Sequence, residues 1–125
     1  MFALVLINTV GGDMKNLSIA QLKAISDLDI RVDGKLLELD RLAKKFQNNY
    51  LLTGENSQLD AAGHILNTIN LENKHRGWQK EILAKDGEDY LFAYTNALEQ
   101  IISNSEFLLE NYAGLFQGLY GLTFS

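Results

Sequence analysis

The 125-residue sequence contains no cysteine and no proline. The absence of cysteine excludes disulfides, thiolate metal sites and a cysteine nucleophile. The absence of proline means that no helix is interrupted by a missing backbone N–H group. Basic residues are also absent from the last third of the chain, because no lysine or arginine follows Lys85. The absence of cysteine and proline favours a helical protein, and a length of 125 residues is usual for one domain, so we expect a single helical domain over residues 1–125.

Charge is divided unevenly along the chain, whose net charge is −5. Residues 1–85 carry ten acids and eleven bases, whereas residues 86–125 carry six acids and no base. A net acidic chain is not typical of nucleic-acid binding, so we expect no nucleic-acid partner. The acidic, apolar-rich end segment suits a basic protein surface, and the alternative is that its acids only solvate one face.

The main apolar run near the start, Phe2–Ile7, is too short to cross a membrane as a helix. It also lacks the preceding basic residues of a secretory signal. We therefore expect no membrane span and a soluble, cytoplasmic protein. The run itself is expected to form a buried strand or a helical turn.

Apolar residues recur every three or four positions in several segments, which predicts an all-α helical bundle of four to five helices. Ser18 and Gln21 form a capping-box pattern at the start of the first, and Ser57 with Asp60 forms a second. Gly54 is a typical residue for ending a helix. The expected helices span about 19–28, 35–52, 58–70 and 78–85, with residues 71–77 as a polar connector.

The final helix is expected to begin at Glu88 and Asp89, after a break at Asp86-Gly87, because acids stabilise a helix N-terminus. Two interpretations remain open for its end. Residues 103–105 (Ser-Asn-Ser) either stop it and cap another helix, or one long helix continues through residue 120.

The segment Asp29–Asp40 has three interpretations. Acids and a glycine occur at several positions of an EF-hand-like loop, but Arg31 stands where a calcium ligand belongs. We therefore favour a joint between two helices, with Asp33 as N-cap. Residues 30–36 also fit a hairpin with an Asp-Gly turn, which with Phe2–Ile7 would give an α+β fold with a small three-stranded sheet.

Few residues of the sequence are candidates for catalysis or metal binding. Asp60 and His64 lie one helical turn apart and His75 lies in the expected connector, so they are the candidates if the protein is a small enzyme. No short catalytic motif is present, and we expect no catalytic site, metal or cofactor. Residues 74–80 mix cations with Trp78, which we interpret as a polar loop whose tryptophan reaches the core.

The segment from Phe107 to Phe124 has one charged residue among 18 and three glycines, Gly114, Gly118 and Gly121. Such glycines weaken a helix by about 1 kcal/mol each unless close packing compensates. The segment therefore packs either inside the fold or against a partner. The residues predicted to bind a partner are Glu106, Phe107, Glu110, Tyr112, Phe116, Gly118 and Tyr120.

The function that these features favour is non-enzymatic protein binding, as in a small inhibitor, immunity protein or chaperone that binds a basic partner surface. One alternative is the small enzyme that uses Asp60, His64 or His75. The other is a self-assembling structural subunit, a homo-oligomer held by the C-terminal segment.

Overall fold

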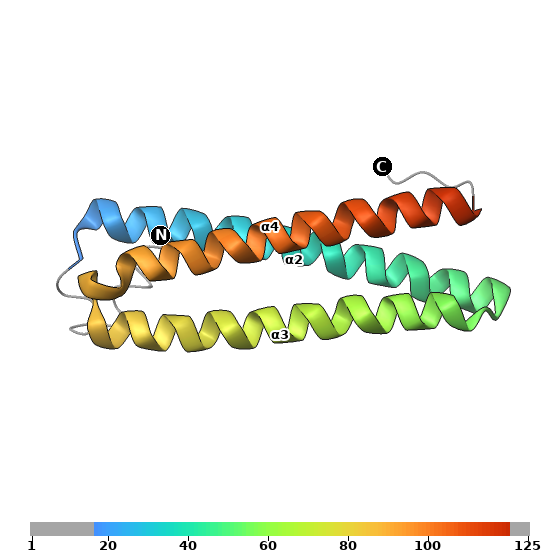
Figure 1. The fold of residues 1–125 in the computed structure, drawn as a ribbon, viewed down its shortest axis with the longest axis horizontal. Coiled ribbons are helices and arrows are strands. Elements are labelled where there is room, and N and C mark those ends of the chain that lie inside the picture. Colours follow the sequence, from blue (N-terminus) through green and yellow to red (C-terminus); the bar gives the residue numbers. More distant parts are fainter. Residues whose placement is uncertain (1–16, 121–125) are drawn as a thin grey trace.

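The computed structural model describes residues 17–120, with side chains described as far as residue 114. This part of the chain forms three helices, α2 (Ile19–Thr53), α3 (Asn56–Asp86) and α4 (Glu88–Tyr120), and contains no strand. Figure 1 shows them side by side, with α3 running opposite to α2 and α4. The predicted helical bundle is confirmed, but the prediction of four to five helices was wrong. The strand or turn expected at Phe2–Ile7 lies outside the described residues.

Helix α2 replaces the two helices predicted over residues 19–28 and 35–52. It begins as predicted: the Ser18 hydroxyl accepts the Gln21 N–H at 3.1 Å, and the Gln21 side chain accepts the Ser18 N–H at 2.8 Å. It ends at Gly54, whose φ of 71° is left-handed, as expected for a glycine that terminates a helix.

The predicted break at Asp33-Gly34 was wrong, because α2 continues through both residues. Residues 29–40 therefore form neither an EF-hand-like loop nor a hairpin, and Asp33 is not an N-cap. A glycine costs a helix about 1 kcal/mol, whereas each buried leucine stabilises it by about 1.5–3 kcal/mol. Packing prevails here because the buried positions keep a spacing of three and four residues on both sides of Gly34: Leu22, Ile25, Asp29, Val32, Leu36, Leu39, Ala43 and Phe46.

Helix α3 likewise replaces two predicted helices and their connector over residues 71–77. Its N-cap is Glu55, which makes no capping hydrogen bond with its side chain, so the capping box predicted at Ser57 and Asp60 was wrong. Trp78 does not reach the core either, since 59% of its surface is exposed. The basic stretch around Trp78 is helix, not loop.

Helix α4 begins at Glu88, directly after Gly87, as predicted. It passes through residues 103–105 without interruption and reaches Tyr120, which confirms the single-helix interpretation. Ser105 is buried, so this polar triplet contributes a residue to the core.

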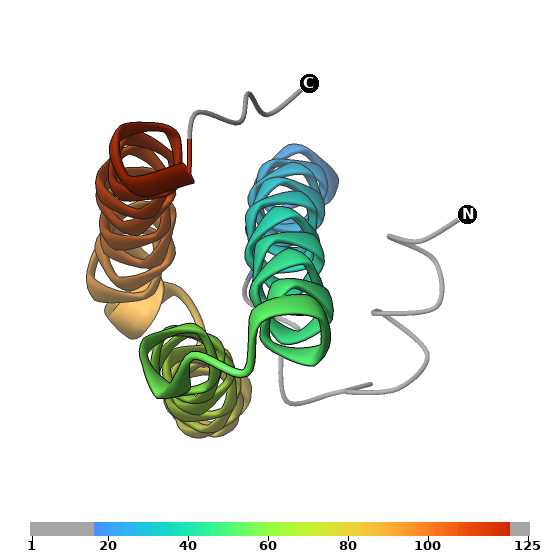
Figure 2. The ribbon, with the colours of Figure 1, turned by 90° about the vertical axis from the view of Figure 1, so that its right-hand side faces the viewer.

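The core lies along the line where the three helices meet. Viewed end-on in Figure 2, α3 lies on one side of both α2 and α4. The alternating three- and four-residue spacing of the buried positions is that of helices packed at a shallow angle. The largest fully buried apolar side chains are Phe46, Tyr94, Ile25, Leu39, Ile65, Leu83, Leu98 and Ile101.

Candidate functional site

The outer face of α4 carries the acids that the sequence singled out. All five acids of this helix are exposed, and the helix has no base. Phe92 and Phe107, which are 79% and 66% exposed, lie on the same side, because successive residues turn by 100° around a helix. We call this set the acidic face of α4: Glu88, Asp89, Phe92, Glu99, Glu106, Phe107 and Glu110.

Of the predicted partner-binding residues, Glu106, Phe107 and Glu110 lie on the acidic face of α4. Tyr112 instead turns inward, where its ring meets Phe46 edge-to-face with centroids 5.7 Å apart. Phe116, Gly118 and Tyr120 lie on the last turns of α4, and their side chains are outside the described part of the structure.

The candidate catalytic residues do not meet at one place. Asp60, His64 and His75 all lie on α3, and His75 is three turns, roughly 16 Å, beyond His64. His64 lies near Tyr112 with ring centroids 6.0 Å apart, whereas His75 lies near Trp78 at 6.2 Å. The geometry therefore assembles no acid–base pair from these residues.

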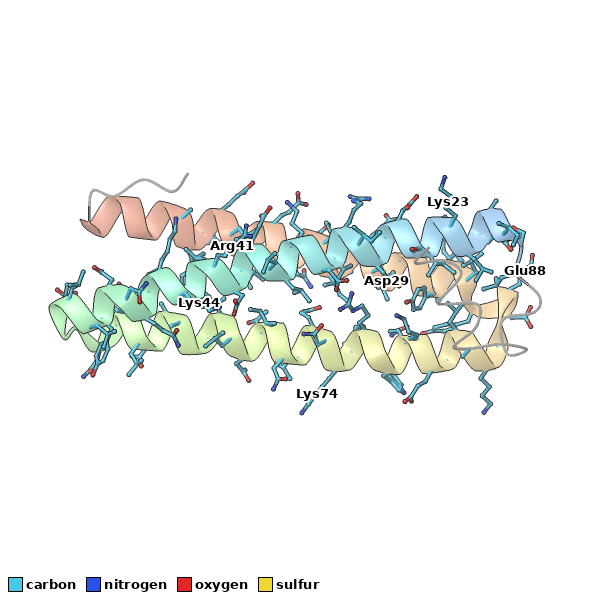
Figure 3. All side chains as sticks on the ribbon, turned by 180° about the vertical axis from the view of Figure 1, so that it is seen from behind. Lys23, Asp29, Arg41, Lys44, Lys74 and Glu88 are labelled. Atoms are coloured by element: carbon cyan, nitrogen blue, oxygen red, sulfur yellow. The ribbon has the colours of Figure 1, made fainter. Side chains whose placement is uncertain are left out.

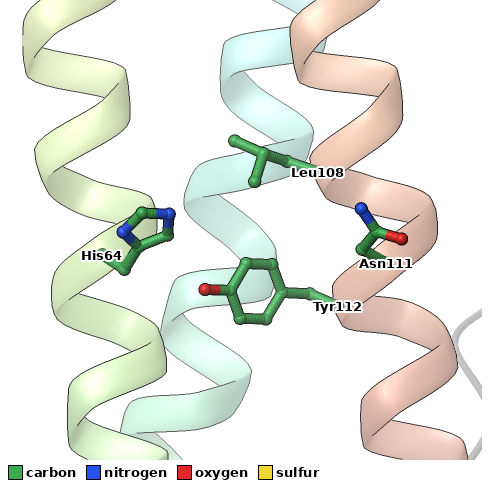
Figure 4. Close-up of a pocket in the computed structure, with 4 residues that line it drawn as sticks. All are labelled: His64, Leu108, Asn111 and Tyr112. Carbon is green, nitrogen blue, oxygen red and sulfur yellow. The ribbon is translucent and has the colours of Figure 1, made fainter.

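A pocket of about 420 Å³ opens between α3 and α4. Figure 4 shows the His64 ring and the Tyr112 hydroxyl pointing toward one another, with Leu108 and Asn111 completing the lining. Burial raises the pKa of Tyr112, so its hydroxyl stays protonated at neutral pH. The lining holds one imidazole and no carboxylate, and no group of three or more metal-ligating side chains occurs within residues 17–120.

A second cluster, which sequence reasoning missed, lies inside the bundle around Asp29. Its side chain is 2% exposed, and Figure 3 shows Asp29 on the stretch of α2 that faces α3. Arg76 Nη1 and Lys80 Nζ approach the two carboxylate oxygens at 3.6 and 3.5 Å. Arg76 also pairs with Asp33 at 2.7 Å and donates to the Asp29 carbonyl at 3.4 Å.

The cluster extends to α4 and forms a polar layer across the core. Gln79 of α3 is buried and accepts a hydrogen bond from the Tyr90 hydroxyl. The buried Tyr94 hydroxyl and both carboxylate oxygens of Asp29 have no hydrogen-bond partner among the described residues. We call this the Asp29 layer: Asp29, Arg76, Gln79, Lys80, Tyr90 and Tyr94.

Burial dominates the electrostatics of the Asp29 layer. It raises the pKa of Asp29 above its ordinary value, although Lys80 and Arg76 counteract part of this effect. Burial, followed by the neighbouring Asp29 carboxylate, also raises the pKa of Tyr94. The phenol therefore stays neutral, and the layer resembles a structural ion cluster more than a set of groups poised for proton transfer.

We expect the Asp29 layer to make the free energy of unfolding depend on pH. The raised pKa means that the folded chain binds this proton more tightly than the unfolded chain, so ionisation of Asp29 destabilises the fold above its raised pKa. This penalty disappears as the pH falls toward 3.8, the ordinary value. The Asp29→Asn variant lacks it, so wild type should gain stability relative to the variant as the pH falls from 7 to 4. Urea unfolding across this range measures the difference, and parallel pH curves for the two proteins would contradict it.

Comparison of the chain with known protein families, with characterised proteins and with solved structures found no match. No helix in residues 17–120 has a stretch long and apolar enough to span a membrane.

Proposed function

We propose that this protein is a non-enzymatic binding module and that a basic protein partner docks on the acidic face of α4. One observation carries the proposal: a single solvent-facing side of a 33-residue helix holds five acids, two exposed phenylalanines and no base. Small inhibitors, immunity proteins and chaperones that neutralise a basic surface would need such a face.

The two kinds of residue have different roles in this proposal. The acids attract a basic partner and mainly raise the rate and selectivity of association. Phe92 and Phe107 act as apolar anchors, since buried aromatic side chains dominate the energy of many interfaces. Most of their surface is exposed in the isolated chain, so their burial by a partner is favourable.

The experiment places a photo-crosslinking residue at Phe107 and, as a matched control, at Leu71 on α3, which is 56% exposed. We expect the Phe107 position to yield one discrete adduct with a protein that presents a basic surface in a lysate of the source cells. The yield should fall at high salt because exposed charges are screened. It should also fall at least about tenfold when Phe92 is replaced by serine, as expected for an anchor.

The Leu71 position should give no such adduct. Equal adducts from both positions, or an adduct insensitive to salt and to Phe92→Ser, would contradict the proposal. Substitution is preferable to truncation here, because Tyr112 packs against Phe46 and removing the end of α4 would open the core.

A further inference from the structure

The side of the bundle that faces away from α3 combines the acidic face of α4 with basic residues of α2. The Lys35–Glu106 ion pair, 3.5 Å long, joins α2 to α4. The α3 contacts come from elsewhere on both helices, since Asp33 of α2 pairs with Arg76 and Tyr90 of α4 bonds Gln79. Figure 2 shows the same division, with α2 and α4 adjacent and α3 on their other side.

Helical geometry defines which residues share this side, because each residue advances 100° around the axis. We call the set the α2–α4 face. Helix α2 contributes five bases and two acids to it: Lys23, Arg31, Lys35, Arg41, Lys45, Asp27 and Glu38. Helix α4 contributes four acids and one phenylalanine: Glu88, Glu99, Glu106, Glu110 and Phe92.

The α2–α4 face is therefore divided into a basic strip and an acidic strip that run along neighbouring helices. Figure 3 labels Lys23 and Arg41 along α2. Lys35–Glu106 is the ion pair that joins the strips among the described residues, whereas Arg31, Arg41, Glu99 and Glu110 take part in no ion pair there. The charges of these four side chains are thus not neutralised by an ion pair among the described residues of one chain.

We propose that the partner of the acidic face of α4 is a second copy of this chain, which docks through the α2–α4 face and supplies the basic strip of its α2; this inference rests on the proposed function. A two-fold axis parallel to the helices places the acidic strip of each copy on the basic strip of the other. A two-fold axis across the helices would instead oppose strips of like charge. The interface is therefore isologous, as in most homodimers.

Residue levels along the helices agree with this pairing. A two-fold axis parallel to the helices keeps every residue at its own height, and the Lys35–Glu106 pair defines equal heights on α2 and α4. Helices α2 and α4 run parallel, so the rise per residue gives every other height relative to that pair. Arg31 then lies about 4.5 Å in height from Glu99, and Arg41 lies about 3 Å in height from Glu110. Long arginine side chains span such offsets.

The area of the α2–α4 face is also sufficient for a dimer interface. Two adjacent helices about 50 Å long and about 10 Å wide present roughly 1,000 Å², comparable to the roughly 800 Å² that each partner buries in a standard interface. Exposed ion pairs contribute only about 0.2–1 kcal/mol each, so the dimer should be weak and sensitive to salt.

The test measures molar mass by light scattering across a concentration series at about 50 and about 500 mM salt. Wild type should approach twice the 14.0 kDa of one chain at low salt, with a dissociation constant that rises at least about tenfold at high salt. Two charge-reversed variants provide the decisive comparison: Glu99→Lys with Glu110→Lys on α4, and Arg31→Glu with Arg41→Glu on α2. The fold should tolerate them, because these four exposed side chains take part in no ion pair among the described residues.

Each reversed variant should be monomeric alone, since its α2–α4 face then carries a clear excess of one charge: seven bases against four acids in the α4 variant, and three bases against eight acids in the α2 variant. Mixed together, the two variants should form a heterodimer, because one presents an acidic face and the other a basic face. A wild type that stays monomeric at low salt would overturn self-association, and the Phe107 crosslink would then have to yield a different basic protein. A dimer that persists in both reversed variants would overturn it too, by assigning dimerisation to another surface.

Discussion

Replacing Arg76 by methionine is expected to lower the free energy of unfolding by about 3 kcal/mol, because it removes a cation from a buried carboxylate. Asp29 would then keep Lys80 at 3.5 Å as its remaining cation, with its side chain still 2% exposed. Methionine preserves most of the arginine stem, so the loss reflects charge and hydrogen bonding more than packing. Part of the Arg76 side chain reaches solvent, which places the expected loss at the lower end of the range for broken buried pairs.

The matched control is Lys74→Met, two residues earlier on the same helix. Lys74 is exposed, projects away from the bundle in Figure 3 and takes part in no ion pair among the described residues. Its removal should change the unfolding free energy by less than about 0.5 kcal/mol, as surface substitutions usually do. Urea denaturation of both variants measures the difference.

The double variant Asp29→Leu with Arg76→Met tests the mechanism. Replacing a buried ion pair by apolar side chains is often neutral or stabilising, so the double variant should recover most of the stability that Arg76→Met loses. Equal losses in Arg76→Met and Lys74→Met would show that the Asp29 layer does not couple α2 to α3.

The Asp29 layer also explains where sequence reasoning failed. The breaks predicted near Asp33 in α2 and over residues 71–77 in α3 lie at the same height of the bundle, where Arg76 meets Asp33. At this height Arg76 and Gln79 stand on the core side of α3, so the apolar period of that helix fades. An interpretation based on hydrophobic spacing alone assigns such a stretch to a loop. In α2 the apolar period continues through Val32 and Leu36, and the break was predicted from the Asp33-Gly34 pair. Pairing between Asp29 and cations 47 and 51 residues away is a tertiary feature with no local signal.

Where local chemistry is sufficient, the sequence predicts the structure well. The capping box at Ser18, the left-handed glycine at Gly54 and the start of α4 at Glu88 all depend on residues within one helical turn. The acidic face of α4 could also be predicted in part, because it depends on composition and helical spacing. Its position beside the basic strip of α2 could not, because it depends on how the three helices pack.

The second large effect concerns glycines inside helices. Gly34, Gly63 and Gly77 are exposed within α2 and α3, and a Cβ atom added at any of them meets nothing within 4 Å. Replacing all three by alanine should raise the free energy of unfolding by about 2 kcal/mol, because alanine loses less backbone entropy in a helix. The contributions should add, because these residues have no shared neighbours.

The single substitution Gly34→Ala separates the continuous helix α2 from the turn predicted at Asp33-Gly34. In a turn with a left-handed glycine, alanine at residue 34 would destabilise the fold; in a continuous helix it stabilises it. Gly54→Ala is the internal control, because Gly54 has a φ of 71° with equally open surroundings and should lose about 1 kcal/mol on substitution. Thermal and urea unfolding of the triple variant, of Gly34→Ala alone and of Gly54→Ala provide the comparison. A loss of stability in Gly34→Ala would mean that α2 is interrupted there, and would remove the continuous helix on which both the Asp29 layer and the α2–α4 face depend.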